Sequence, residues 1–176
     1  MLEMKWKVLV VVDDSAAGKR AVDCAVDLCL AGFDSKLYLL YIKDMEPILI
    51  PSEKEEKKLY RSLRAKARKT MLDIAKKLKK AEVDFEVIGY HFGIAAEEIE
   101  RVERKLGLDM IIIGAQKLSL FSKLLGGHYS EKTIFETKTP VLVVKPEYKP
   151  KIKLIEASTV DPVRIVTVAR NKRALT

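Results

Sequence analysis

The feature that most constrains the fold of this chain is a regular alternation between short apolar runs and amphipathic segments. The first run, Lys7–Val12 (KVLVVV), is almost continuously β-branched, which is typical of a strand buried on both faces of a sheet. Similar apolar or alternating patterns predict further strands over residues 35–42, 83–90, 109–114 and 141–145. Apolar residues at helical spacing predict helices over residues 15–30, 53–80, 95–106 and 130–137.

This alternation predicts an α/β fold, because each helix must bury its apolar stripe against a sheet of parallel strands. We expect an open, doubly wound, five-stranded parallel sheet with helices on both faces, formed by residues 1–146. Residues 147–176 are expected to form a basic C-terminal arm in which Val163–Ala169 (VRIVTVA) is a short strand. Ligands of such sheets bind beyond the carboxyl ends of the strands, where we expect Asp13, Ile42 and Gly114.

One predicted helix carries a charge of +8, equal to the net charge of the whole chain. Residues 53–80 hold 12 Lys or Arg against 4 Asp or Glu, and their apolar residues recur at helical spacing. We interpret the charge as the solvated face of an amphipathic helix. Nucleic acid binding is not expected, because aromatic stacking platforms and a recognised binding motif are missing.

Other features of the composition favour a cytoplasmic protein that does not enter the membrane. No apolar run approaches the roughly 20 residues that a bilayer span needs, and the first residues do not resemble a secretory signal. Cys24 and Cys29 lie five positions apart on a predicted helix, so their side chains point about 140° away from each other and do not pair. Two unpaired thiols fit a reducing compartment.

One segment has the character of a phosphate-binding loop. Residues 111–132 read IIIGAQKLSLFSKLLGGHYSEK, which is a buried strand leading into a glycine turn, followed by a second glycine turn that opens a helix. Glycine allows backbone N–H groups to approach a phosphate closely. Lys117 and Lys123, between the two turns, are further phosphate partners. The segment therefore favours an anion-binding loop.

Several motifs, in order and spacing, resemble the universal stress protein family. KVLVVVDDSAAGKRAVDCAVDL resembles its opening strand, turn and helix, with Asp14 in place of a glycine. GIAAEEIERVERKLGLDMIIIG and TPVLVVKP resemble its later helix, its fourth strand and its closing strand. The resemblance covers residues 5–146 and implies the adenine nucleotide alpha hydrolase-like fold. It also implies a homodimer formed through the strand at residues 141–145.

The resemblance further implies a set of nucleotide-binding positions. Asp13 matches the carboxylate that contacts adenosine, and the other matching positions are Ile42, Gly114, Lys117, Gly127, His128, Tyr129 and Ser130. Nucleotide-binding members carry glycine at the position of Lys117 and a hydroxyl residue at that of His128. The loop of this chain has thus exchanged glycine for charge, and a left-handed backbone at Lys117 would cost about 1–2 kcal/mol.

Two functions therefore stay open from the sequence. The first is a dimeric regulatory module that binds ATP or a related adenine nucleotide, with Mg²⁺ beside Asp13 and Asp14. The second is a stress protein that binds no nucleotide and acts on an unknown protein partner through its surface or its C-terminal arm. Catalysis beyond a slow ATPase activity is not expected. A protein-held metal site is not expected either, because His91, His128 and the cysteines lack the spacing of metal ligands.

Overall fold

The sheet of this protein has five strands, all parallel, in the order β3-β2-β1-β4-β5. The computed structural model describes residues 5–45, 50, 52–115 and 137–151. The strands are β1 (Trp6–Val12), β2 (Ser35–Asp44), β3 (Phe85–Gly93), β4 (Met110–Gly114) and β5 (Val141–Val144), and the helices are α1 (Ala16–Leu30), α2 (Glu53–Lys80) and α3 (Ala95–Leu106). The predicted open α/β sheet is confirmed.

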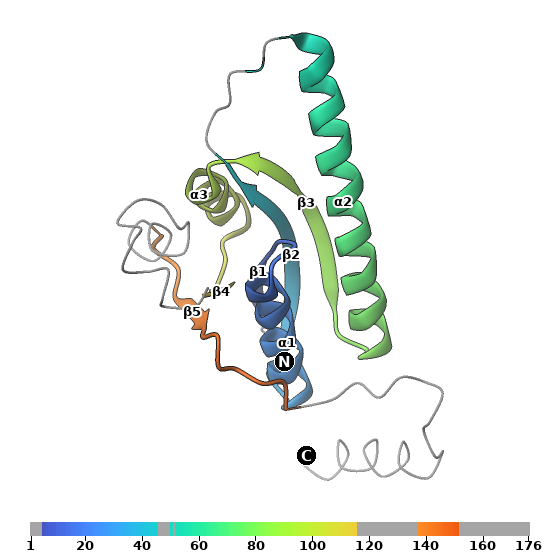
Figure 1. Cartoon of the computed structure of the whole chain (residues 1–176). Coiled ribbons are helices and arrows are strands. Elements are labelled where there is room, and N and C mark those ends of the chain that lie inside the picture. Colours follow the sequence, from blue (N-terminus) through green and yellow to red (C-terminus); the bar gives the residue numbers. More distant parts are fainter. Residues whose placement is uncertain (1–4, 46–49, 51, 116–136, 152–176) are drawn as a thin grey trace, which may run out of the picture.

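The helices cover both faces of the sheet, as expected for a doubly wound fold (Figure 1). On one face, Val8, Val10 and Val12 pack with the apolar residues of α1 and α2. On the other face, Leu9 and Val11 pack with those of α3. Successive residues of β1 thus face opposite clusters, and Val8 to Val12 are all fully buried, which explains why the strand is continuously apolar.

Local signals in the sequence fix the helix boundaries. The Ser15 side chain caps α1 by accepting hydrogen bonds from the N–H groups of Ala17 and Gly18. Ser52 caps α2, whose first turn holds three glutamates and whose last turn holds three lysines, both favourable for the helix dipole. α3 ends at Gly107, which adopts a left-handed conformation with φ 60°.

The expected boundaries of the third strand differ from the observed ones. The alternating pattern predicts residues 83–90, whereas β3 spans Phe85–Gly93. Val83 belongs to the turn after α2 and not to the strand, because its N–H donates to the carbonyl of Leu78. In the same turn, Glu82 has φ 55°. At its end, β3 continues beyond Tyr90 to Gly93, which still pairs with Asp44 of β2. β3 lies at an edge of the sheet.

The chain order of the strands creates a switch point between β1 and β4. From β1 the chain passes to β2 and β3 on one side, and it then returns to β4 and β5 on the other side of β1. The predicted helix at residues 130–137 and the strand-like segment at residues 163–169 lie outside the described residues, apart from Thr137. None of the described helices combines the length and apolar character that a membrane span requires.

Candidate functional site at the carboxyl ends of β1 and β4

The turn between β1 and α1 is held by Asp13 and Ser15. Oδ1 of Asp13 accepts hydrogen bonds from the backbone N–H of Ser15 at 2.9 Å and from its hydroxyl at 2.5 Å. Within the part of the chain that the structure describes, no donor is recorded for the second carboxylate oxygen, Oδ2. Asp13 therefore shapes the turn with one oxygen and keeps the other as an acceptor at the switch point.

Gly114, the last residue of β4, brings that strand against the first turn of α1. A Cβ atom added at Gly114 would lie 1.9 Å from the carbonyl oxygen of Ala17 and 2.4 Å from its carbonyl carbon. Real Cβ contacts are rarely shorter than 3.4 Å, so a side chain here has no room. The exit of β4 thus lies directly beside the amino end of α1, where the helix dipole favours an anion.

Arg20 places a positive charge at the same point. Its Nη2 donates a hydrogen bond of 2.7 Å to the carbonyl of Ala115, and the N–H of Ala115 donates to Val144 of β5 at 2.8 Å. Nε of Arg20 is buried, and no partner for it is recorded among the described residues. Sequence reasoning missed Arg20, because no local pattern shows that a residue of α1 reaches the end of β4, 95 positions later.

Ile42 lies next to the turn, but its side chain belongs to the core. Val12, the last residue of β1, pairs with Tyr41, so Ile42 follows one position beyond the end of β1. The side chain of Ile42 is fully buried in the cluster beneath α3. Only the backbone of Ile42 is therefore placed to face a ligand at the switch point. Ile42 thus lies at the expected place in the sheet, but its side chain is not available to contact a ligand.

The remaining expected site residues, Lys117, Gly127, His128, Tyr129 and Ser130, lie outside the described residues. The structure does describe both ends of the segment that carries them. The segment leaves the sheet at Ala115 and returns at Thr137. Both ends are hydrogen-bonded to the folded body, the first through Arg20 and Val144.

Glu103 of α3 holds the returning end. Its Oε1 accepts hydrogen bonds of 2.6 to 2.9 Å from the Thr137 hydroxyl, the Lys138 N–H, and both the N–H and hydroxyl of Thr139. Burial alone would raise the pKa of Glu103, but the hydrogen bonds from Thr139 and Thr137 outweigh it and lower the pKa. The charged carboxylate of Glu103 therefore anchors residues 137–139, which lead into β5, to α3.

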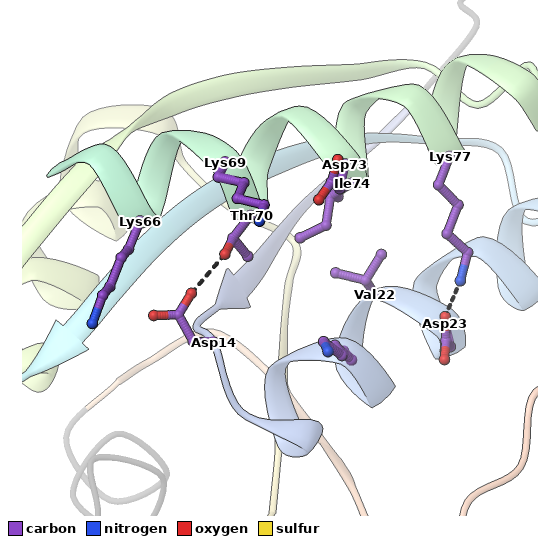
Figure 2. A pocket seen from close by; sticks show the side chains of 10 residues that line it. Asp14, Val22, Asp23, Lys66, Lys69, Thr70, Asp73, Ile74 and Lys77 are labelled. Atoms are coloured by element: carbon purple, nitrogen blue, oxygen red, sulfur yellow. Dashed lines mark hydrogen bonds and ion pairs between the residues drawn. The ribbon is translucent and has the colours of Figure 1, made fainter. Parts of the chain in front are cut away.

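Asp14 points away from the switch point, into a groove between α1 and α2 (Figure 2). It accepts hydrogen bonds from the Thr70 hydroxyl at 2.6 Å and from the Tyr41 hydroxyl at 2.7 Å. Burial by itself would raise the pKa of Asp14, but these bonds and the charges of Lys43 and Lys66 lower it. Asp13 and Asp14 therefore bond to different partners, and the sequence did not separate their roles.

The groove has a volume of about 650 Å³, and two of the carboxylates that line it are already bonded to α2. Asp14 is bonded to α2, and Asp23 forms an ion pair with Lys77. The carboxyl ends of β1 and β4 instead present an acceptor on Asp13 and a buried donor on Arg20 for which no partner is recorded among the described residues. We therefore place the candidate ligand site at the switch point.

Comparison with known proteins gives consistent matches. The model of the universal stress protein family matches residues 4–145. Universal stress protein MJ0531 of Methanocaldococcus jannaschii is 25% identical over 148 residues, covering 82% of this chain and 83% of the relative. The solved structure of hypothetical protein MJ0577 has a TM-score of 0.63 and 26% identity, covering 83% of this chain and 99% of the other.

A second similar structure contains a nucleotide. It is a universal stress protein family protein from Arabidopsis thaliana with AMP bound, with a TM-score of 0.58 and 19% identity. The match covers 80% of this chain and 91% of the other. At this identity the match shows a shared fold.

Proposed function

The chain belongs to the universal stress protein family, and from that premise we propose that it is a regulatory module that binds an adenine nucleotide. The observation that carries the proposal is the geometry of the switch point. There the Asp13 carboxylate, the amino end of α1 and the Arg20 guanidinium converge beside the exit of β4. A nucleotide needs an acceptor for its sugar hydroxyls and donors for its phosphates, and this site offers both.

The residues of the site divide between the two ends of the ligand. Oδ2 of Asp13 accepts from the adenosine portion, and the backbone of Ile42 lies alongside it. The positive end of the α1 dipole and the Arg20 guanidinium face the phosphates, with Lys117 adding a third source of positive charge. Mg²⁺, where the ligand is ATP, supplies further charge neutralisation for the phosphates. The AMP-bound Arabidopsis thaliana protein supports an adenine nucleotide as the ligand class.

We further propose that the module works in the cytoplasm as a homodimer joined through residues 141–145. β5 forms the second edge of the sheet, and Val141, Leu142 and Val143 are only partly buried. An apolar edge strand of this kind is prone to pair with another chain. The N–H of Ala115 bonds to β5, so a ligand at the switch point lies one hydrogen bond away from the dimer edge.

Titration calorimetry with ATP and Mg²⁺ tests the nucleotide proposal. Asp13→Asn keeps an acceptor oxygen for Ser15 but replaces the other oxygen with a donor, so we expect it to weaken ATP binding at least 10-fold. It should weaken inorganic triphosphate less, because Asp13 acts at the adenosine end. Asp14→Asn is the matched control: it removes the same charge one residue away, from a side chain that points into the α1–α2 groove.

Two outcomes would overturn the proposal. Equal effects of Asp13→Asn and Asp14→Asn on ATP binding would mean that general electrostatics, and not a contact with Asp13, governs affinity. No heat and no shift in melting temperature with ATP, ADP or AMP at millimolar concentration would mean that the nucleotide site is lost. Light scattering that shows a monomer at micromolar concentration would refute the dimer.

The exchange of glycine for Lys117 and of a hydroxyl residue for His128 favours a second function, a stress protein that acts through protein contacts alone. Lys117→Gly separates the two proposals. In a nucleotide-binding module it changes ATP affinity, upward if the loop regains its shape or downward if the charge is needed. Native mass spectrometry of the purified protein gives an independent answer, since an adenine nucleotide retained by the wild type and lost from Asp13→Asn supports the first function.

A further inference from the structure

One flank of α2 carries a row of positively charged side chains, which we call the basic stripe. Its members are all exposed and follow one another at three, four or eight positions: Lys54, Lys57, Arg61, Arg64, Arg68, Lys76 and Lys79. At 100° per residue they fall within an arc of about 120°. Leu72, which is 62% exposed, fills the gap between Arg68 and Lys76. No acidic residue of α2 lies in this arc.

The structure shows that the basic stripe faces away from the rest of the protein. The buried residues Ala67, Met71, Ile74 and Leu78 turn one side of α2 to the sheet. Thr70, Asp73 and Lys77 turn the next side to the groove with α1 (Figure 2). The basic stripe occupies the opposite flank. All buried residues of α2 lie in its second half, and its first half extends beyond the sheet (Figure 1).

Helix stability does not explain the basic stripe. A solvated helix gains from Glu and Lys placed three or four residues apart, whereas like charges at that spacing lose about 0.2–0.5 kcal/mol per pair. In the described structure Lys57 pairs with Glu53, but no ion pair is recorded for the other six members. Pairs such as Arg61 with Arg64 and Arg64 with Arg68 therefore repel each other. The charge of the stripe between Arg61 and Arg68 therefore gains the helix nothing, and a binding role accounts for it better.

We propose that the basic stripe binds the phosphate backbone of double-stranded nucleic acid without reading its sequence. From Lys54 to Lys79 the stripe is about 37 Å long at 1.5 Å per residue, close to one turn of a duplex. A duplex presents a dense row of phosphates to such a row of cations. Neither aromatic side chains nor a recognition motif is needed for backbone contacts, so their absence from the sequence does not weigh against this binding mode.

The same observations disfavour other polyanions. An amphipathic helix that lies on a membrane needs an apolar face for the lipid, and the apolar face of α2 is buried on the sheet, which leaves Leu72 exposed in the stripe. Single-stranded nucleic acid is held by stacking on aromatic side chains, and the basic stripe contains none.

The test is a salt titration of binding to a fluorescent duplex of about 30 base pairs and mixed sequence, long enough for the whole stripe. With seven phosphate contacts, the slope of log K against log salt should be about −6, so affinity falls about 10³–10⁴-fold between 50 and 200 mM KCl. Arg61→Gln, Arg64→Gln and Arg68→Gln together should make the slope shallower by about 2.7 and weaken binding at every salt concentration. Gln is a good helix former, so circular dichroism should be unchanged.

A matched triple variant provides the control. Lys19→Gln, Lys66→Gln and Lys69→Gln remove the same charge from exposed lysines that line the α1–α2 groove. Their slope should stay within about one unit of the wild-type slope. Equal losses in both triple variants would overturn the proposal in favour of a general effect of net charge. Tighter binding to a single strand of the same sequence, or binding only to vesicles that contain phosphatidylserine, would overturn it as well.

Discussion

Replacing Gly114 with alanine tests the close approach on which the candidate site depends. The new Cβ would lie 1.9 Å from the carbonyl oxygen of Ala17, whereas ordinary contacts begin at 3.4 Å. The end of β4 and the first turn of α1 must therefore separate by about 1.5 Å. The atoms that collide with the new Cβ belong to the backbone, so no side-chain rotation can relieve the contact.

The cost of this separation can be worked from general values. Overpacking of a well-packed interior costs about 1–3 kcal/mol, and a contact between a new methyl group and fixed backbone belongs at the upper end. Alanine regains about 0.5–1 kcal/mol, because glycine in a strand carries an entropic penalty. The net loss in the free energy of unfolding is thus about 2 kcal/mol, which lowers the Tm of a chain of this size by about 4–8 °C.

Differential scanning calorimetry and urea unfolding measure this loss. Gly107→Ala is the control: Gly107 has φ 60° with open space around it, so that variant introduces backbone strain but does not move β4. Gly114→Ala should also weaken ATP binding, whereas Gly107→Ala should leave it unchanged. A Gly114→Ala protein with the melting temperature and ATP affinity of the wild type would refute the close approach of β4 and α1.

Three further predictions concern the contacts that hold the sheet and its helices together. Asp14→Ala should cost about 1–3 kcal/mol, because the buried Tyr41 hydroxyl loses its acceptor, and a double-mutant cycle with Tyr41→Phe should show the coupling. The pKa values of Asp14 and Glu103 are both lowered in the folded state, so the stability that these carboxylates contribute is present above about pH 4 and is lost as the pH falls through their folded-state pKa values. The urea midpoints of Asp14→Asn and Glu103→Gln should therefore fall less on acidification than the wild-type midpoint. Truncation after Pro146 removes Tyr148, whose hydroxyl bonds to Asp27 of α1, and should lower the melting temperature, whereas an unchanged melting temperature would mean that the start of the arm is not docked.

Local signals in the sequence predicted most of the described fold. The bounds of α2 and α3 follow from apolar spacing, the Ser52 cap and Gly107, all of which act within a few residues. The parallel pairing of the strands follows from the alternation of strands and helices, because each helix must bury its apolar stripe on the sheet. The start of β3 was predicted two residues early, because the turn after α2 takes up Val83 and Asp84.

Contacts between distant parts of the chain could not be predicted in the same way. Asp14 bonds to Thr70 across 56 positions, and Arg20 bonds to Ala115 across 95. Neither pair leaves a periodic or local pattern in the sequence. The adjacent acids Asp13 and Asp14 therefore looked equivalent, although one shapes the turn at the switch point and the other links α1 to α2. For the same reason the role of Glu103 in holding the entry to β5 was not predicted.

The location of the ligand is tested most directly by amide chemical shifts of the isotope-labelled protein during a titration with ATP and Mg²⁺. The account predicts saturable shifts at Asp13, Ser15 and Ala115, at the carboxyl ends of β1 and β4. It also predicts that Asp13→Asn weakens the response while Asp14→Asn does not. Saturable shifts confined to the groove between α1 and α2, around Lys66 and Thr70, would contradict the account.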